Sequence, residues 1–206
     1  MSDSLPTIHV ARHGETAWTV SGQRTGLTDL PLIERGERDA RRLGERLRGL
    51  AFARVFTSPL QRASRTCALA GYGDFAVVDP DLVEWDYGDY EGRRTSEIVV
   101  ERPGWQLFRD GCPGGESPAD VAARADRVVA RVRALDANVL LFSSADFQRV
   151  LAARWLGLPP AAGALFVLGT ASLGVLGYDH DRTEPAVRLW NDTRHAGDGA
   201  LSSATR

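Results

Sequence analysis

The feature that most constrains this chain is residues 8–16, which read IHVARHGET. An apolar, β-branched run ends here in an arginine, a histidine and a glycine, which is typical of a buried strand that delivers reactive side chains to the edge of a sheet. The glycine permits a tight turn and the close approach of an anion. Arg12 offers a planar set of donors that suits phosphate, and His13 can act as a nucleophile when a neighbour orients its ring. An arginine–histidine pair alone indicates an ordinary strand end, but the full sequence directly after a strand favours a functional site.

Two more blocks carry candidate groups for the same chemistry. Residues 58–66 (SPLQRASRT) predict a strand that ends at Ser58 and a helix that starts at Pro59, with Arg62 one turn in, where the helix dipole also favours anions. Residues 81–92 (DLVEWDYGDYEG) crowd carboxylates and aromatic rings together, and burial beside such rings raises the pKa of an acid, as a general acid requires. Taken alone, the two blocks are also compatible with a solvated helix face and a solvated acidic loop.

Together these blocks resemble the signature of the histidine phosphatase superfamily, also called phosphoglycerate mutase-like, and the similarity runs from residue 8 to about residue 192. The resemblance implies four catalytic side chains: His13 as nucleophile, Arg12 and Arg62 as phosphate ligands, and Glu84 as proton donor. The loop at residues 23–29 (QRTGLTD) is similar to the loop with which family phosphatases hold substrate, which implies three substrate contacts: Gln23, Thr25 and Gly26. The nearby Glu91 is expected to be structural.

One block departs from the family pattern. Where family members usually end a strand in a second essential histidine, residues 143–149 read SSADFQR, and alignment on the flanking residues puts Ser144 at the histidine position. A neutral hydroxyl is a weaker donor than an imidazolium, and the loss of one preorganised donor typically costs about 10²–10³ in rate. Asp146 either points away or, if it faces the site, opposes phosphate. The remaining histidines are expected elsewhere: His9 in the core, His180 in a polar turn and His195 in the tail.

The resemblance therefore implies a metal-independent phosphomonoester hydrolase that acts through a phosphohistidine, with Ser144 lining the pocket. The implied partner is a small phosphorylated molecule, either a sugar phosphate or a phosphoglycerate derivative. Two alternatives stay open on the same fold: an enzyme repurposed for other chemistry, and a non-catalytic binder of phosphorylated ligands.

Alternating strand and helix patterns predict a three-layer α/β/α sandwich with a mainly parallel sheet, in one domain that spans residues 1–206. Strands are expected at residues 8–10, 55–58, 76–78, 139–143, 165–168 and 172–178. Helices are expected at residues 34–50, from 59, at 94–102, from 117 to 135, and at 147–158, and Ser117 with Asp120 predicts a capping box for the fourth of these. Ile33 offers no cap to the helix that follows it, and the polar tail after Asp192 is expected to fray.

Composition narrows the partners further. The net charge is −2, so no global field attracts nucleic acid or a membrane surface. Every basic residue other than histidine is arginine, and any anion site must therefore use arginine. The two cysteines show no CxxC spacing, and neither a metal site nor a cofactor is expected. The absence of a long apolar run predicts a cytoplasmic protein, and a homodimer is left open.

Overall fold

Two parallel strands form the centre of the fold. In this computed structural model, which describes residues 5–196, β1 (Ile8–Arg12) pairs with β4 (Val139–Ser143) so that Arg12 lies opposite Ser143. The described residues form one six-stranded sheet in the order β3-β2-β4-β1-β5-β6. The pairings among β1 to β4 are parallel, whereas β5 and β6 are antiparallel to their neighbours. The outer strands are β2 (Arg54–Thr57), β3 (Ala76–Val78), β5 (Leu173–Tyr178) and β6 (Pro185–Asp192).

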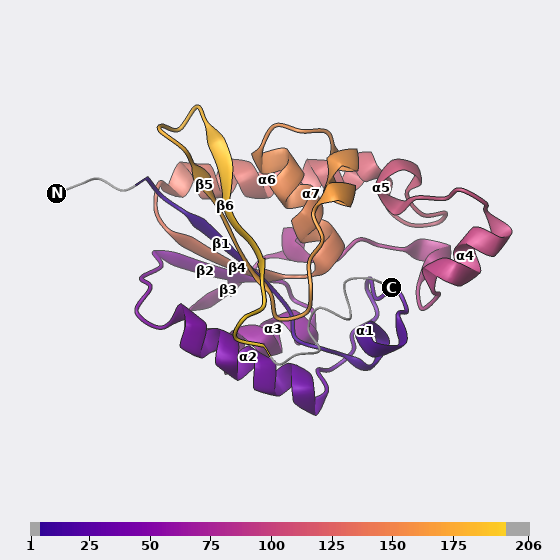
Figure 1. The fold of residues 1–206 in the computed structure, drawn as a ribbon, viewed down its shortest axis with the longest axis horizontal. Coiled ribbons are helices and arrows are strands. Elements are labelled where there is room, and N and C mark those ends of the chain that lie inside the picture. Colours follow the sequence, from indigo (N-terminus) through magenta and orange to yellow (C-terminus); the bar gives the residue numbers. More distant parts are fainter. Residues whose placement is uncertain (1–4, 197–206) are drawn as a thin grey trace.

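Helices cover both faces of this sheet (Figure 1). One face carries α2 (Glu34–Leu47) and α3 (Gln61–Leu69), and the other carries α6 (Pro118–Leu135) and α7 (Ala145–Trp155). Three short helices lie together at one end of the molecule: α1 (Ala17–Ser21), α4 (Thr95–Glu101) and α5 (Leu107–Asp110). The described 3-10 turns are Gly73–Phe75, Pro80–Leu82, Gly88–Tyr90 and Pro160–Leu165. The three-layer α/β architecture with a mainly parallel sheet is confirmed.

The core is divided by the sheet into two hydrophobic clusters. The cluster under α6 and α7 contains Val10, Leu141 and Trp155, and the cluster under α2 and α3 contains Leu43 and Phe142. All five residues of β4 are buried, as expected for a parallel strand covered on both faces. This burial fixes the strand firmly and with it the position at which α7 begins.

Local sequence explains several helix ends. Ser117 accepts a hydrogen bond from the main-chain N–H of Asp120, whose carboxylate accepts from the Ser117 N–H, so the predicted capping box is present. Ile33 makes no capping hydrogen bond, as expected, and α2 starts without one. Thr16 forms a capping box with Thr19 and starts the short α1, which was not predicted within the loop.

Some predicted boundaries are wrong. Residues 165–168 are not a strand: Leu165 ends a 3-10 turn, and the main-chain oxygens of Val167 and Leu168 accept bonds from the side chains of Trp190 and Arg12. The last strand is instead β6, whose sequence alternates too weakly to reveal it. The helix expected at residues 147–158 is α7, which starts at Ala145 and ends at Trp155.

The expectation of a frayed tail falls largely on residues 197–206, which lie outside the described residues, as do residues 1–4. Just before them the chain is held in place. Arg194 pairs with Asp192, and the His195 ring bonds the main-chain oxygen of Ala171.

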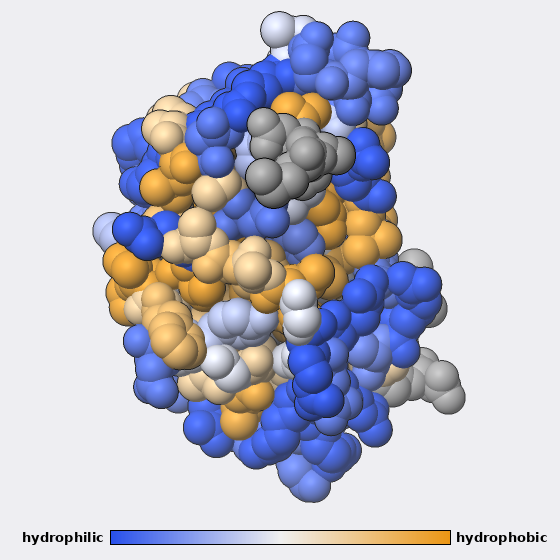
Figure 2. Space-filling model, turned by 90° about the vertical axis from the view of Figure 1, so that its left-hand side faces the viewer, coloured by the Kyte–Doolittle hydropathy of each residue, from blue (hydrophilic) through white to orange (hydrophobic). Residues whose placement is uncertain are grey.

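The side of the molecule that carries the amino ends of the parallel strands has a mixed surface. Figure 2 shows hydrophobic side chains gathered in a band across this face, between hydrophilic regions. Exposed apolar residues of the described chain include Phe75 and Val77 at the β3 edge of the sheet. No helix among residues 5–196 is long and apolar enough to cross a bilayer.

Two glycines bring α2 against the turn that follows β1. A Cβ atom on Gly36 would overlap the main chain of Glu15, and one on Gly14 would overlap the main chain of Gly36. The close approach is secured by hydrogen bonds from Ile33 N–H to Glu15 O (2.9 Å) and from Gly14 N–H to the Thr66 hydroxyl (3.0 Å). The turn that presents His13 therefore depends on the absence of side chains at both positions.

We expect Gly36→Ala to lower the free energy of unfolding by about 1–3 kcal/mol, because the added methyl group meets main-chain atoms that cannot move without displacing the turn. This loss exceeds the gain of about 1 kcal/mol that alanine normally brings to a helix interior. Urea unfolding followed by circular dichroism measures the free energy of unfolding of this variant and of the wild type. Glu45→Ala, at an exposed position of α2, is the control, and equal stability of the two variants would contradict the packing argument.

Candidate functional site

The carboxyl end of β1 delivers Arg12 and His13 to the edge of the sheet. The His13 N–H donates to Ser143 O (3.0 Å), and the Ala171 N–H donates to His13 O (3.0 Å), so the main chain at this point is held between β4 and the approach to β5. Both side chains line a cavity of about 190 Å³ at the carboxyl edge of the strands. Ligand sites in open α/β sheets lie at this edge.

The His13 ring has a defined tautomer. Its Nδ1 lies 2.7 Å from Gly14 O, and because a carbonyl oxygen only accepts, Nδ1 carries the proton and Nε2 is left with its lone pair. Burial and the charges of Arg62 and Arg12 hold the pKa of His13 well below its ordinary value of 6.5. The ring is therefore a neutral imidazole with an available nitrogen at neutral pH.

Arg12 has N–H groups available for a ligand, whereas the Nη groups of Arg62 are bound to main-chain oxygens. One Arg12 Nη donates to Leu168 O (2.6 Å), and its buried Nε has no partner among the described residues. The two Nη groups of Arg62 donate to three main-chain oxygens of the loop, those of Thr25 (3.1 Å), Gly26 (2.7 Å) and Thr28 (2.9 Å). Arg62 is fully buried and does not line the cavity, although its unpartnered Nε and its effect on His13 show that it lies behind the site.

The loop at residues 22–28 forms one wall of the cavity. Gln23 and Thr25 line it, but the Gln23 amide is engaged with the Ser21 hydroxyl (2.6 Å) and Gly92 O (2.8 Å). Gly26 does not line the cavity; its N–H donates to the Glu91 carboxylate (2.9 Å). Glu91 thus holds the loop, which agrees with the structural role expected for it.

Glu84 also lines the cavity. Its carboxylate is buried and accepts hydrogen bonds from the main-chain N–H groups of Trp85 (2.9 Å), Asp146 (3.1 Å) and Phe147 (2.8 Å), the last two in the first turn of α7. Burial and the neighbouring charge of Asp146 raise the pKa of Glu84, while the three N–H groups act in the opposite direction. The result is an acid with a raised pKa in a cavity wall.

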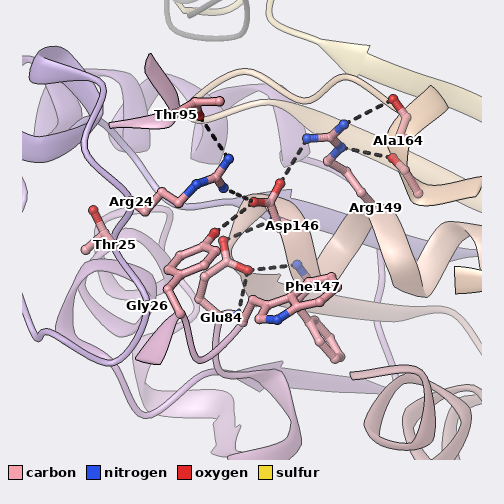
Figure 3. A network of polar contacts seen from close by, with 12 residues as sticks. Arg24, Thr25, Gly26, Glu84, Thr95, Asp146, Phe147, Arg149 and Ala164 are labelled. Atoms are coloured by element: carbon pink, nitrogen blue, oxygen red, sulfur yellow. Dashed lines mark hydrogen bonds and ion pairs between the residues drawn. The ribbon is translucent and has the colours of Figure 1, made fainter. Parts of the chain in front are cut away.

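Ser144 and Asp146 occupy the start of α7 but behave differently. Ser144 is at the N-cap position, yet its hydroxyl caps nothing, is fully buried, has no partner among the described residues and does not line the cavity. Asp146 does line the cavity, which settles the alternative left open by the sequence. Its charge is balanced rather than exposed to the site, because Arg24 and Arg149 flank it (Figure 3).

The cavity residues that were not predicted include Arg24, Tyr87, Thr95 and Arg149. Arg24 stacks on the rings of Tyr87 (5.2 Å) and Trp105 (4.8 Å) and bonds the Thr95 hydroxyl (3.0 Å). Arg24 lies in the block at residues 23–29 and Tyr87 in the block at residues 81–92. Both blocks carry candidate site residues, so their long polar side chains could have been predicted to line the cavity. Thr95 carries no comparable signal.

A metal ion needs several histidine or carboxylate ligand atoms close together. Among residues 5–196, one group of histidine and carboxylate side chains has suitable geometry: Asp179, His180 and Glu184 in the turn between β5 and β6. All three are exposed, and none lines the cavity around His13. Neither His180 nor His195 reaches the site, and His9 is half-buried against the Phe52 ring (5.0 Å).

The fold and this site define an α/β protein with a buried histidine at the carboxyl edge of a mainly parallel sheet. Residues 8–193 match the model of the histidine phosphatase superfamily (branch 1), and the chain belongs to this family.

Named relatives show the same likeness. The chain is 40% identical to an acid phosphatase of Mycobacterium tuberculosis over 180 residues, which cover 85% of this chain and 88% of the relative. It is 38% identical to a sedoheptulose 1,7-bisphosphatase of Saccharomyces cerevisiae over 191 residues, which cover 77% and 70%. It also resembles the solved structure of a mycobacterial glucosyl-3-phosphoglycerate phosphatase, with 28% identity, a TM-score of 0.80 and coverage of 91% and 99%.

The depressed pKa of His13 makes folding sensitive to acid. Below pH 6.5 the unfolded chain binds a proton at this residue that the folded chain does not bind, so stability falls as the pH is lowered through that value. We expect His13→Asn to lose less stability than the wild type on acidification, by up to about 1.4 kcal/mol per pH unit. Urea unfolding at pH 7.5, 6.0 and 5.0 measures the difference, with His180→Asn as the control. Equal acid sensitivity of wild type and His13→Asn would contradict a neutral buried ring.

Proposed function

We propose that this protein is a phosphomonoesterase that transfers the phosphoryl group of a small phosphorylated metabolite first to His13 and then to water. The observation that carries the proposal is the state of the His13 ring. It is neutral, its Nδ1–H is bound to Gly14 O, and it lines the same cavity as Arg12 and Glu84. A histidine held in this way meets the requirement for an activated nucleophile.

In the first step, Nε2 of His13 attacks phosphorus, an N–P bond forms, and the bond from phosphorus to the ester oxygen breaks. Arg12 donates to the phosphoryl oxygens as negative charge builds on them, and the charge of Arg62 behind the ring adds to the same field. Glu84, whose pKa is raised by burial and by Asp146, gives its proton to the leaving oxygen.

In the second step, the Glu84 carboxylate takes a proton from water as the water oxygen attacks phosphorus. The N–P bond breaks, inorganic phosphate leaves, and Glu84 and His13 return to their starting states. All groups in both steps belong to this chain, so the proposed reaction uses no metal ion or cofactor.

The cavity supports a hydroxylated substrate. Besides the charged groups it is lined by hydroxyl and amide side chains, those of Thr19, Gln23, Thr25, Tyr87 and Thr95. Such groups suit a sugar phosphate or a phosphoglycerate derivative, and two relatives bear the names of a sugar bisphosphatase and of a glucosyl-3-phosphoglycerate phosphatase. We therefore propose this substrate class.

We further infer that Ser144 stands where the family pattern has its second histidine and that turnover is slow for this reason. The support is its place at the N-cap of α7, two residues before the Asp146 N–H that bonds the Glu84 carboxylate, together with a buried hydroxyl that has no hydrogen-bond partner among residues 5–196. A serine there cannot supply the charge-assisted donor that a histidine supplies to a phosphoryl oxygen.

The direct test is hydrolysis of p-nitrophenyl phosphate and of glycerol 2-phosphate by the wild-type protein and His13→Asn. We expect measurable release of phosphate by the wild type and a loss of at least about 10³-fold in kcat in the variant, because the nucleophile is removed. His180→Asn, changed in an exposed turn, is the control. Binding of both esters without turnover would instead support the non-catalytic binder, and equal rates in wild type and His13→Asn would overturn the proposal.

A second prediction concerns Ser144. We expect Ser144→His to raise kcat on both esters by about 10²-fold, because it restores one preorganised donor to the phosphoryl group. Ser144→Leu, the control, adds a side chain of similar bulk that has no hydrogen-bond donor, and it should not raise kcat. A folded Ser144→His protein with unchanged kcat would contradict the assignment of this position.

A further inference from the structure

The carboxylate of Asp146 is held in the cavity wall by three side chains. One oxygen accepts from the Tyr87 hydroxyl (2.7 Å) and lies 3.4 Å from an Arg24 Nη, and the other accepts from an Arg149 Nη (2.9 Å). These partners come from two separate loops and from α7 itself, and Figure 3 shows the carboxylate held between the two guanidinium groups. The side chain is therefore fixed in one position.

This network keeps Asp146 ionised. Burial alone would raise the pKa of Asp146, but the charges of Arg149 and Arg24, the Tyr87 hydroxyl and the charge of Arg12 lower it below its ordinary value. A carboxylate that is ionised and bound by three donors is a poor source of a proton. Asp146 is thus excluded as the acid of this site.

The pKa of Glu84 is shifted the other way: burial first, and the charge of Asp146 next, raise it, although several neighbouring groups favour the ionised form. Three main-chain N–H groups donate to its carboxylate, and the cations Arg12 on β1 and Arg62 on α3 lie close enough to interact with it. On α6, Arg124 faces only the main-chain oxygen of Glu84 (3.3 Å). Burial opposes these groups most, and Asp146 is the anion that adds to its effect; the Asp146 N–H is one of the three that hold the Glu84 carboxyl group.

We propose that Asp146 is a positioning residue for Glu84: its main-chain N–H fixes the Glu84 carboxyl group in the cavity wall, and its carboxylate, as a neighbouring anion, favours the acid form of that group. The inference rests on the proposed function, in which Glu84 protonates the leaving oxygen. It also explains why an anion is present in a cavity meant for phosphate. Arg24 and Arg149 balance its charge, while the effect on the adjacent Glu84 remains.

The test is a titration of the Glu84 carboxyl carbon by NMR in protein labelled with ¹³C-glutamate, with the signal assigned by its loss in Glu84→Gln. We expect Asp146→Asn to lower the pH of the Glu84 titration midpoint, because the neighbouring anion is removed while the main-chain N–H stays. Asp89→Asn, which removes a carboxylate outside the cavity, is the matched control and should leave the midpoint in place. A structural role alone would alter the melting temperature but not this midpoint.

A second variant is expected to shift the Glu84 titration midpoint in the opposite direction. Arg149→Gln removes a cation that balances Asp146, so the Glu84 midpoint should rise, and this variant decides the question alone if Asp146→Asn does not fold. An unchanged Glu84 midpoint in a folded Asp146→Asn, or an unchanged or lowered one in Arg149→Gln, would overturn the inference.

Measuring the hydrolysis of two phosphate esters distinguishes a failure of this inference from a failure of the proposed function. With glycerol 2-phosphate, whose alkoxide needs a proton to leave, Asp146→Asn should lose roughly tenfold in kcat at neutral pH, and more at higher pH. With p-nitrophenyl phosphate, whose phenolate leaves unaided, the loss should be smaller. If the Glu84 midpoint shifts as expected but neither ester is hydrolysed by the wild type, the positioning role stands and the proposed function fails.

Discussion

The hydrogen bonds from the first N–H groups of α7 to the Glu84 carboxyl group hold the site together. These bonds connect the segment that follows Leu82 to the end of β4. A further hydrogen bond, from the Ser143 hydroxyl to Leu82 O (2.6 Å), connects the same two segments. The free N–H groups at the start of a helix need partners, and a buried carboxyl group is a strong one. Since β4 is buried on both faces, the position of α7, and with it that of Glu84, is fixed by the core of the sheet.

The charges of the site follow from the same arrangement. Around His13 the cations are in excess, and burial with Arg62 and Arg12 keeps the ring neutral. Around Glu84 the balance is different, because Asp146 lies beside it and is itself compensated by Arg24 and Arg149. One cavity is thus lined by a histidine whose pKa is lowered and a carboxyl group whose pKa is raised, and two groups with shifted pKa values in one cavity are a feature of sites that transfer protons.

The sequence predicted the parts of this arrangement that are local. The strand that ends at Arg12 and His13, the apolar β4 and the capped start of α6 all follow from short patterns, and the structure contains them. What could not be predicted depends on contacts distant in the chain. Whether the Arg62 Nη groups face a ligand or the loop at residues 25–28 is decided by packing, and so is the balance of Asp146 by Arg24, which lies 122 residues away.

The same reasoning explains why the start of α7 needs no capping side chain. Ser144 contributes no hydrogen bond to the helix end, because the Glu84 carboxyl group already accepts from the two N–H groups that a capping side chain would serve. The Asp146 charge is met by side chains from outside the helix, so it adds no unpaired charge to the core. The strand, the helix and the Glu84 carboxyl group between them are therefore held without a contribution from the Ser144 side chain.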